Sequence, residues 1–294
     1  MKKPYDIGIG ILVTIMWGCN FSVIELGLQS LDPFILTFLR FLLCCFPFIF
    51  FMEKPKNVSL LSIALYGILF GAGLWWVVNF AMYKGLTPGL SSVFLQFSAF
   101  FTIIISVIFI KEKINFVHFI GMLLSCLGLS IIIIFSSEES TSVGIFLVLL
   151  AALSWAFCNL IVKITKPQNM VAFIVWSSLF SFPTIFIMTL CVKGISPFLQ
   201  IFTNLNISAT FSVVFQAYIT TILGYWIWNN LMKKYPAATI APLSLIVPIS
   251  GMLCSYIFFG EKLTYIELIA ISIIILGIAI FINSNKLKNL LLEN

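Results

Sequence analysis

The chain has 294 residues and a formal net charge of +6, and hydrophobic residues make up 61% of it against only 9% for charged residues. Soluble domains carry about 25% charged residues, so this chain has too few polar side chains to cover a soluble fold. The composition excludes an ordinary soluble domain and predicts an integral membrane protein.

Apolar runs long enough to cross a bilayer as helices recur ten times along the chain. A membrane-spanning helix needs about 20 apolar residues, whereas the strands of outer-membrane barrels have about 10 residues and alternate in polarity. The runs here are long and do not alternate, so we predict an all-α fold with ten transmembrane helices. In chain order the predicted spans are Ile7–Gln29, Pro33–Met52, Leu60–Tyr83, Leu90–Ile110, Phe116–Phe135, Val143–Val162, Val171–Val192, Ala209–Leu231, Ala237–Phe259 and Tyr265–Ile282.

The lysines gather on one side of the predicted membrane. With a cytoplasmic N-terminus, only Lys84, Lys193 and Lys262 face the other side. Basic residues favour cytoplasmic loops, so we predict cytoplasmic N- and C-termini and attribute the positive charge to topology and not to nucleic-acid binding. The apolar stretch after Lys2 and Lys3 is too long for a secretory signal. The cytoplasmic lysines are then Lys2, Lys3, Lys54, Lys56, Lys111, Lys113, Lys163, Lys166, Lys233, Lys234, Lys286 and Lys288.

The two halves of the chain share a repeated pattern. Phe109-Ile110-Lys111-Glu112-Lys113 in the first half corresponds to Phe258-Phe259-Gly260-Glu261-Lys262 in the second, and Gly128 and Gly277 share the same offset of 149. Duplication of five crossings, an odd number, puts the second copy upside down, an architecture typical of secondary transporters. We predict two inverted five-helix repeats, over residues 1–137 and 138–294.

Polar and aromatic residues recur at helical spacing within six of the spans. Because polar groups at membrane depth are costly, we expect those on shared helical faces to line a cavity. The alternatives are interfacial anchoring by Trp and Tyr and hydrogen bonding between helices by Asn, Gln and Ser. The second, fifth, seventh and tenth spans carry fewer such residues and are expected to form an outer ring. The predicted substrate-binding residues are Trp17, Asn20, Phe21, Asn79, Gln96, Phe100, Trp155, Asn159, Tyr225, Trp228 and Ser244.

Two charged residues within spans are candidates for coupling substrate transport to an ion such as a proton. Glu25 lies late in the first span, where a carboxylate either carries a proton during a transport cycle or reaches the outer membrane surface. Arg40 is the only arginine in the chain. It either binds a carboxylate in bidentate fashion, including that of an amino-acid substrate, or ties two helices together. Glu112 and Glu261 precede helices, and we expect them to cap the helix N-termini.

The remaining signals are structural. The seven cysteines all fall within apolar spans, and we predict small buried side chains without disulfides. Gly67 and Gly71 form a G-x-x-x-G pattern that favours close helix packing, and Pro47, Pro183 and Pro248 are expected to interrupt helices. The chain carries none of the common motifs for hydrolysis, metal binding or phosphate binding. We therefore predict no cofactor and no enzymatic activity.

Several segments of both halves match a known transporter family. They include Trp17-Gly18-Cys19-Asn20-Phe21, Leu39-Arg40-Phe41, Gln96 with Ala99-Phe100-Phe101-Thr102-Ile103, Ser154-Trp155-Ala156, Gly224-Tyr225-Trp226-Ile227-Trp228 and Ala241-Pro242-Leu243-Ser244-Leu245-Ile246-Val247-Pro248. On these segments the chain resembles the EamA family of the drug/metabolite transporter superfamily, and more narrowly the O-acetylserine/cysteine exporters. The resemblance implies ten helices, a central pocket near the midplane, and efflux of small amino-acid-type metabolites across a bacterial inner membrane. Close relatives usually carry Lys where this chain has Glu25.

Three functional hypotheses follow. The first is export of small amino acids or their derivatives by alternating access, with the lipid bilayer as environment and protons as candidate coupling ions. The second is export of aromatic amino acids or cationic compounds, which the Trp and Tyr residues suit. The third is a membrane scaffold or sensor that transports nothing. The pattern leaves the oligomeric state open.

Overall fold

The computed structural model describes residues 4–112, 114–135, 142–260, 264–284 and 287–288. Every regular element within these ranges is helical, which confirms the predicted all-α fold. Eight helical runs in the described residues are long and apolar enough to span a membrane, and the helices at 116–131 and 268–281 are apolar but shorter. The chain is therefore a multi-pass membrane protein. The predicted repeat boundary at residue 137 lies outside the described residues.

The first half contains α1 (Pro4–Leu28), α2 (Pro33–Cys45), η1 (Phe48–Phe50), α3 (Leu60–Ile68), η2 (Leu69–Trp76), α4 (Val77–Tyr83), α5 (Pro88–Phe94), α6 (Phe97–Ile110) and α7 (Phe116–Phe135). The second half contains α8 (Ser142–Thr165), α9 (Met170–Lys193), α10 (Ser196–Leu199), α11 (Ile201–Asn204), α12 (Ile207–Val214), η3 (Phe215–Gly224), α13 (Tyr225–Lys234), α14 (Ala237–Ile240), η4 (Ala241–Ile246), α15 (Val247–Phe259) and α16 (Tyr265–Ile282).

Local sequence explains where several helices begin. The Asp32 side chain accepts a hydrogen bond from the Phe34 backbone N–H, with Pro33 as the first residue of α2. Asn206 caps α12 in the same way through the Ala209 N–H, at 2.8 Å. Short polar side chains satisfy the free N–H groups of a helix start, so these turns set the ends of the spans.

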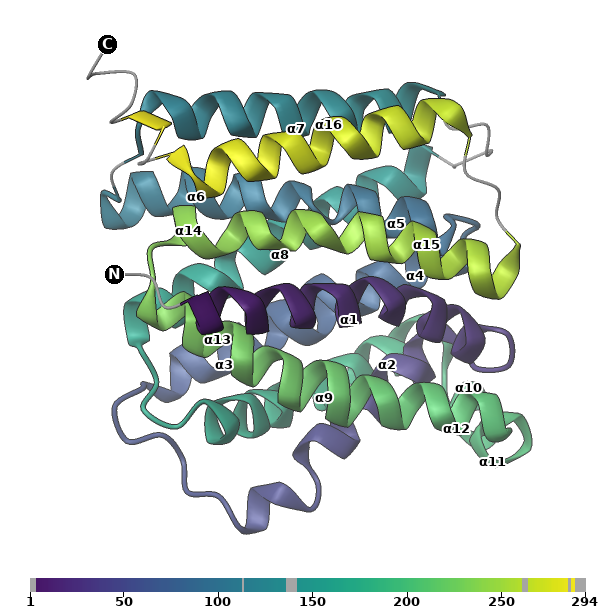
Figure 1. Cartoon of the computed structure of the whole chain (residues 1–294). Helices are drawn as coiled ribbons and strands as arrows, with labels where there is room; N and C mark the ends of the chain where they lie inside the picture. The colour runs from purple at the N-terminus through teal and green to yellow at the C-terminus, as the bar shows by residue number, and fades with distance from the viewer. Residues whose placement is uncertain (1–3, 113, 136–141, 261–263, 285–286, 289–294) are drawn as a thin grey trace.

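The corresponding spans of the two halves run in opposite directions. Asp6 at the start of α1 binds Lys234 and Tyr235 at the end of α13, and Lys163 near the end of α8 donates to the Tyr235 carbonyl oxygen at 2.7 Å. The start of α1 and the end of α8 therefore lie at one end of the bundle, as an inverted repeat requires. Figure 1 shows that α1 begins and α16 ends at this same end. We call it the lysine-rich end, after Lys111, Lys163, Lys166, Lys233 and Lys234.

The helices that precede the two repeated Glu-Lys motifs end in the same backbone conformation. Lys111 ends α6 with a φ of 58°, and its repeat partner Gly260 ends α15 with a φ of 70°. The left-handed conformation is a common way to end a helix and favours glycine. The two helices thus end in the same way, one with the favoured glycine and the other with lysine.

Five of the predicted spans are interrupted. The third and eighth spans contain the π-helical segments η2 and η3, the fourth breaks between α5 and α6 at Leu95 and Gln96, and the ninth contains the 3₁₀ segment η4. In the second span α2 ends just before Pro47, as expected, whereas α9 continues through Pro183 without a break. The third, fourth, eighth and ninth spans correspond between the repeats, and π-segments frequently mark functional sites. Pro248 is the second residue of α15, so it follows an interruption and does not bend a continuous helix.

Two pairs of helices pack extensively, α2 with α9 and α7 with α16, and the second pair is the top layer in Figure 1. A Cβ atom at Gly128 would lie 2.7 Å from the Ala270 carbonyl oxygen, so glycine allows α7 and α16 to pack closely. Gly67 of α3 lies against Ser177 of α9, and Gly71 of η2 lies against Ser181 of α9. The close helix approach expected from the G-x-x-x-G pattern is confirmed.

The expectation that all cysteines are free is wrong. Cys19 of α1 and Cys254 of α15 form a disulfide with their Cα atoms 5.4 Å apart, whereas Cys44, Cys45, Cys126, Cys158 and Cys191 are free. The two partners are separated by 235 residues, and only helix packing brings them together.

Candidate functional site

A small buried pocket lies where the interrupted spans meet α1 and α8. Its volume is about 10 Å³, roughly the space that one water molecule needs. The pocket is therefore closed around its centre, and a larger molecule enters only if the lining side chains separate. The lining residues are Trp17, Phe21, Trp75, Leu95, Gln96, Trp155, Tyr225 and Val247.

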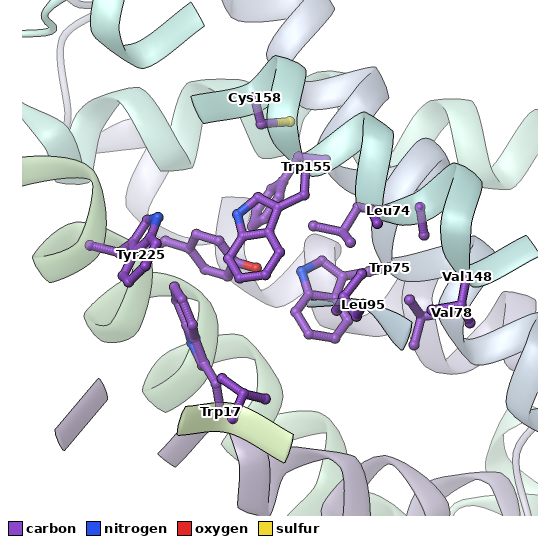
Figure 2. Close-up of a cluster of buried hydrophobic side chains, with 14 of the residues drawn as sticks. Trp17, Leu74, Trp75, Val78, Leu95, Val148, Trp155, Cys158 and Tyr225 are labelled. Carbon is purple, nitrogen blue, oxygen red and sulfur yellow. The ribbon is translucent and has the colours of Figure 1, made fainter. Parts of the chain in front are cut away.

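Aromatic rings from several helices form most of the pocket wall. The centroid of the Trp17 ring lies 4.5 Å from that of Tyr225 and 5.5 Å from that of Trp155. Figure 2 shows Trp17, Trp75, Trp155 and Tyr225 approaching one region from different elements. The Trp17 indole donates to the Thr220 carbonyl oxygen at 3.1 Å, within η3. The widened helix thus holds one wall of the pocket in place.

Gln96 supplies the pocket with an unpaired polar atom. Its amide nitrogen donates to the Ser92 carbonyl oxygen at 2.9 Å, which fixes the side chain across the break between α5 and α6. Its carbonyl oxygen is fully buried and has no hydrogen-bond partner. Buried polar atoms are nearly always paired, so this oxygen marks a position for a water molecule or a ligand donor.

Of the predicted substrate-binding residues, Trp17, Phe21, Gln96, Trp155 and Tyr225 line the pocket. The other six do not line it. Four of them make hydrogen bonds to neighbouring groups: Asn79 donates to Thr37, Asn159 donates to Thr102 and accepts from Trp228, and Ser244 donates to the Ala241 carbonyl oxygen. Phe100 packs edge-on against Phe97. Asn20 is fully buried, and neither polar atom of its amide has a partner.

Three lining residues are absent from the predicted set: Trp75, Leu95 and Val247. Trp75 lies on the same helical stripe as Asn79, but its π-helical segment turns the tryptophan and not the asparagine into the pocket. Leu95 and Val247 flank the interruptions of the fourth and ninth spans. A proline after an apolar residue, as at Val247–Pro248, is the one sequence signal that points to such a position.

Arg40 is fully buried behind the pocket wall. Its guanidinium donates to Thr221 Oγ1 at 2.8 Å, to Gln216 Oε1 at 3.3 Å and to Thr220 Oγ1 at 3.4 Å. Its central carbon lies 3.9 Å from the centroid of the Trp75 ring. Arg40 therefore ties α2 to η3, as one of the two sequence interpretations expected.

Glu25 lines a separate cavity at the end of the bundle opposite the lysine-rich end. This cavity has a volume of about 210 Å³, and Glu25 is the only charged residue among the described residues of its wall. The wall combines the end of α1, the turn from α4 to α5 and the end of α15. The other lining residues are Met82, Gly85, Leu86, Thr87, Pro88 and Phe259.

Polar contacts close the lysine-rich end. Glu112 pairs with Lys163 at 2.8 Å and accepts the Ala237 N–H at 2.8 Å, an arrangement we call the Glu112–Lys163 clasp. The expectation that Glu112 caps the following helix is wrong, because its carboxylate points across the bundle to α8 and the start of α14. Glu261 lies outside the described residues. Across the part of the chain that the structure covers, no three His, Cys, Asp or Glu side chains form a metal-binding group.

The sequence matches known transporters over most of its length. The relatives in Salmonella typhimurium strain LT2 and Escherichia coli strain K12 are each named a probable amino-acid metabolite efflux pump. Each is 32% identical, over 278 and 283 residues, and each match covers 92% of this chain and 93% of the relative. An uncharacterized inner membrane transporter of Escherichia coli strain K12, YedA, is 24% identical over 276 residues, 90% of this chain and 87% of that protein.

The fold is shared with a solved crystal structure. The two superpose with a TM-score of 0.67 at 16% sequence identity, over 95% of this chain and 98% of the other. The EamA-like transporter family matches the chain twice, over residues 6–134 and residues 142–283. With both halves matched, the chain belongs to the EamA-like transporter family.

Proposed function

We propose that this chain is a secondary transporter that exports small amino acids or amino-acid-derived metabolites, of the cysteine and O-acetylserine type, by alternating access. The observation that carries the proposal is the closed pocket with the unpaired oxygen of Gln96, located where interrupted spans of both halves meet. Transporters of inverted-repeat architecture bind substrate near the midplane between the repeats, next to discontinuous helices. The names of the two relatives at 32% identity support the substrate class.

The distribution of cavities supports a transport cycle. The Glu112–Lys163 clasp closes the lysine-rich end, whereas the cavity beside Glu25 hollows the opposite end. We assign the lysine-rich end to the cytoplasm, because basic residues favour that side. In this conformation the pocket is separated from the cytoplasm. Opening of the clasp and separation of Trp17 from Trp155 then admit the substrate.

Glu25 is our candidate residue for coupling transport to proton movement or for releasing the substrate. Its carboxylate stands in a cavity of about 210 Å³, which is large enough for a small amino acid or several waters. A carboxylate there attracts the ammonium group of a departing substrate, or exchanges a proton with the outer solution. Glu25→Gln removes the charge at nearly constant volume. We expect it to lower the transport rate while leaving binding in the central pocket intact.

Transport in proteoliposomes tests the proposed function. We expect saturable movement of L-cysteine, O-acetyl-L-serine or related amino acids, and loss of that movement in Gln96→Leu. Exposed Leu12 provides a matched control on α1, since Leu12→Val changes a lipid-facing side chain and leaves the pocket untouched. Absence of saturable movement for all these amino acids contradicts the proposed substrate class.

The aromatic pocket wall favours a second candidate, export of aromatic amino acids or organic cations. Rings of Trp and Tyr bind flat apolar groups and cations through their faces. Competition separates the two candidates. If L-tryptophan or a quaternary ammonium compound displaces transported O-acetylserine at lower concentration than L-serine does, the second candidate replaces the first.

A further inference from the structure

Arg40 is a buried positive charge whose neighbours are neutral. Among the described residues the ion pairs join Lys56 to Glu53, Lys163 to Glu112, Lys193 to Asp32 and Lys234 to Asp6, and none involves Arg40. Its hydrogen-bond partners are two hydroxyl oxygens and one amide oxygen. A charge removed from water without a counter-ion is costly. The neutral oxygens reduce this cost but leave the net positive charge uncompensated.

Arg40 contacts the wall of the central pocket through two lining residues, directly at Trp75 and indirectly, through Thr220, at Trp17. Trp75, whose ring lies against the guanidinium at 3.9 Å, forms part of the pocket wall. Thr220 accepts a hydrogen bond from Arg40 through its hydroxyl and another from the Trp17 indole through its carbonyl oxygen. Electrostatic interactions extend further where water is excluded. The pocket therefore lies in the field of Arg40 although the guanidinium itself does not line it.

Unpaired polar atoms in the wall match the two ends of a zwitterion. The Tyr225 hydroxyl and the Trp75 indole N–H are buried near each other without a hydrogen bond of normal geometry, and both can donate to an anionic oxygen. The Gln96 carbonyl oxygen is likewise buried and unpaired, and it can only accept. One pocket thus offers donors beside a positive charge together with an acceptor suited to an ammonium group.

We propose that Arg40 makes the pocket select substrates that carry a carboxylate, and that Gln96 receives their ammonium group. The substrate class is then the zwitterionic α-amino acids, to the exclusion of simple amines and of N-acylated acids. This inference rests on the proposed function and narrows it. Arg40 acts as a positioning residue, because it works through Trp75 and η3 and not by direct contact.

The test uses three probes that differ in one charged group each: S-methyl-L-cysteine, its decarboxylated amine 2-(methylthio)ethylamine, and N-acetyl-S-methyl-L-cysteine. Binding to the purified protein is followed by tryptophan fluorescence, since Trp17, Trp75 and Trp155 line the pocket. We expect the wild-type protein to bind the amino acid at least roughly tenfold more tightly than either analogue, because a site built for a polar group rejects a ligand that lacks it.

The variants separate the charge of Arg40 from its role in tying helices. Arg40→Gln should lower the preference for the amino acid over the amine by about tenfold, whereas Arg40→Lys should retain most of it. Thr220→Val removes one acceptor from Arg40 but leaves the charge, and it is the matched control. A folded Arg40→Gln protein with unchanged preference overturns the inference, and so does Thr220→Val with the same loss as Arg40→Gln.

A substitution at Gln96 tests the same inference if the Arg40→Gln protein does not fold. Gln96→Glu places a carboxylate in the pocket, and it should improve binding of the amine relative to the amino acid. An unchanged ratio contradicts the proposed polarity of the pocket. If the wild-type protein binds all three probes equally and still transports amino acids, this inference is wrong but the proposed function stands. Failure of transport for every amino acid defeats the proposed function.

Discussion

Gly67 shows how one missing side chain sets the distance between two helices. A Cβ atom built at this position would lie 2.1 Å from the Ser177 carbonyl oxygen of α9. The Gly67 carbonyl oxygen in turn accepts a hydrogen bond from the Ser181 hydroxyl at 2.7 Å. No rotamer relieves a contact between a Cβ atom and a backbone oxygen, so α3 and α9 can pack this closely only because residue 67 is glycine.

Gly67→Ala is therefore expected to destabilise the protein. Overpacking of this kind costs about 1–3 kcal/mol, and thermal unfolding in detergent measures the loss. Gly8→Ala on α1 is the control, because nothing lies within 4 Å of the added Cβ atom there. It should leave the stability unchanged or raise it slightly, since alanine favours helix more than glycine does. Equal stability of the two variants would falsify this view of the α3–α9 contact.

Side chains of the same chemical type have different roles here, depending on whether they find hydrogen-bond partners on neighbouring helices. Gln96 and Asn159 are both buried amides within spans, yet Asn159 makes hydrogen bonds to Thr102 and Trp228 while the Gln96 oxygen has no partner. We expect Asn159→Ala to affect stability more than substrate specificity and Gln96→Ala to do the reverse. Comparing unfolding temperature with the ratio of transported substrates in the two variants checks this directly.

At the scale of elements, the Glu112–Lys163 clasp joins three segments at one end of the bundle. The Lys163 side chain is 9% exposed and that of Glu112 is 16% exposed, so their interaction is only weakly screened by water. Lys163 also donates to Tyr235, and Glu112 accepts from Ala237. The connection between α13 and α14 is thereby held against α6 and α8.

A double-mutant cycle measures this coupling. Glu112→Gln and Lys163→Met should each lower stability, and the double variant should lose less than the two losses added together, with an interaction of about 0.5–3 kcal/mol. The exposed pair of Lys56 and Glu53, with side chains 86% and 83% exposed, is the control and should give about 0–1 kcal/mol. Strictly additive losses at Glu112 and Lys163 mean that the pair does not hold the clasp together.

The interrupted helices are the second feature at this scale. Helices η2 and η3 are π-helical, and they carry Trp75 and the hydrogen-bond partners of Arg40. In a π-helix the side chains no longer follow the spacing of an α-helix. Trp75 and Asn79 share the stripe that α-helical spacing predicts in the third span, yet only Trp75 lines the pocket.

For the whole molecule, the opposite directions of α1 and α8 have a consequence for topology. Lys111 and Gly260 occupy equivalent positions in the two repeats, at the ends of α6 and α15, and they should face opposite sides of the membrane. We expect a reporter fused after Lys111 to be active in the cytoplasm and one fused after Gly260 to be active outside. Activity of both reporters in the same compartment contradicts the inverted repeat, the repeat boundaries that we propose near residue 137, and the assigned orientation of the termini.

The sequence by itself determined the class of the protein, its helical spans and its repeats. These properties depend on local quantities, namely the length of apolar runs, the placement of lysines and the recurrence of the Glu-Lys turns. Such features predict a membrane-spanning helix whatever surrounds it. Five of the lining residues were also found from sequence because they combine large or polar side chains with membrane depth, as Trp17 and Gln96 do.

Only the tertiary structure decided which polar groups meet the pocket and which bind one another. The Cys19–Cys254 disulfide, the contact of Arg40 with η3 and the pairing of Glu112 with Lys163 each join segments far apart in the chain. The rotation and register of one helix against another set these contacts. Helix spacing in a single segment cannot specify them, because the partner side chain belongs to a different helix.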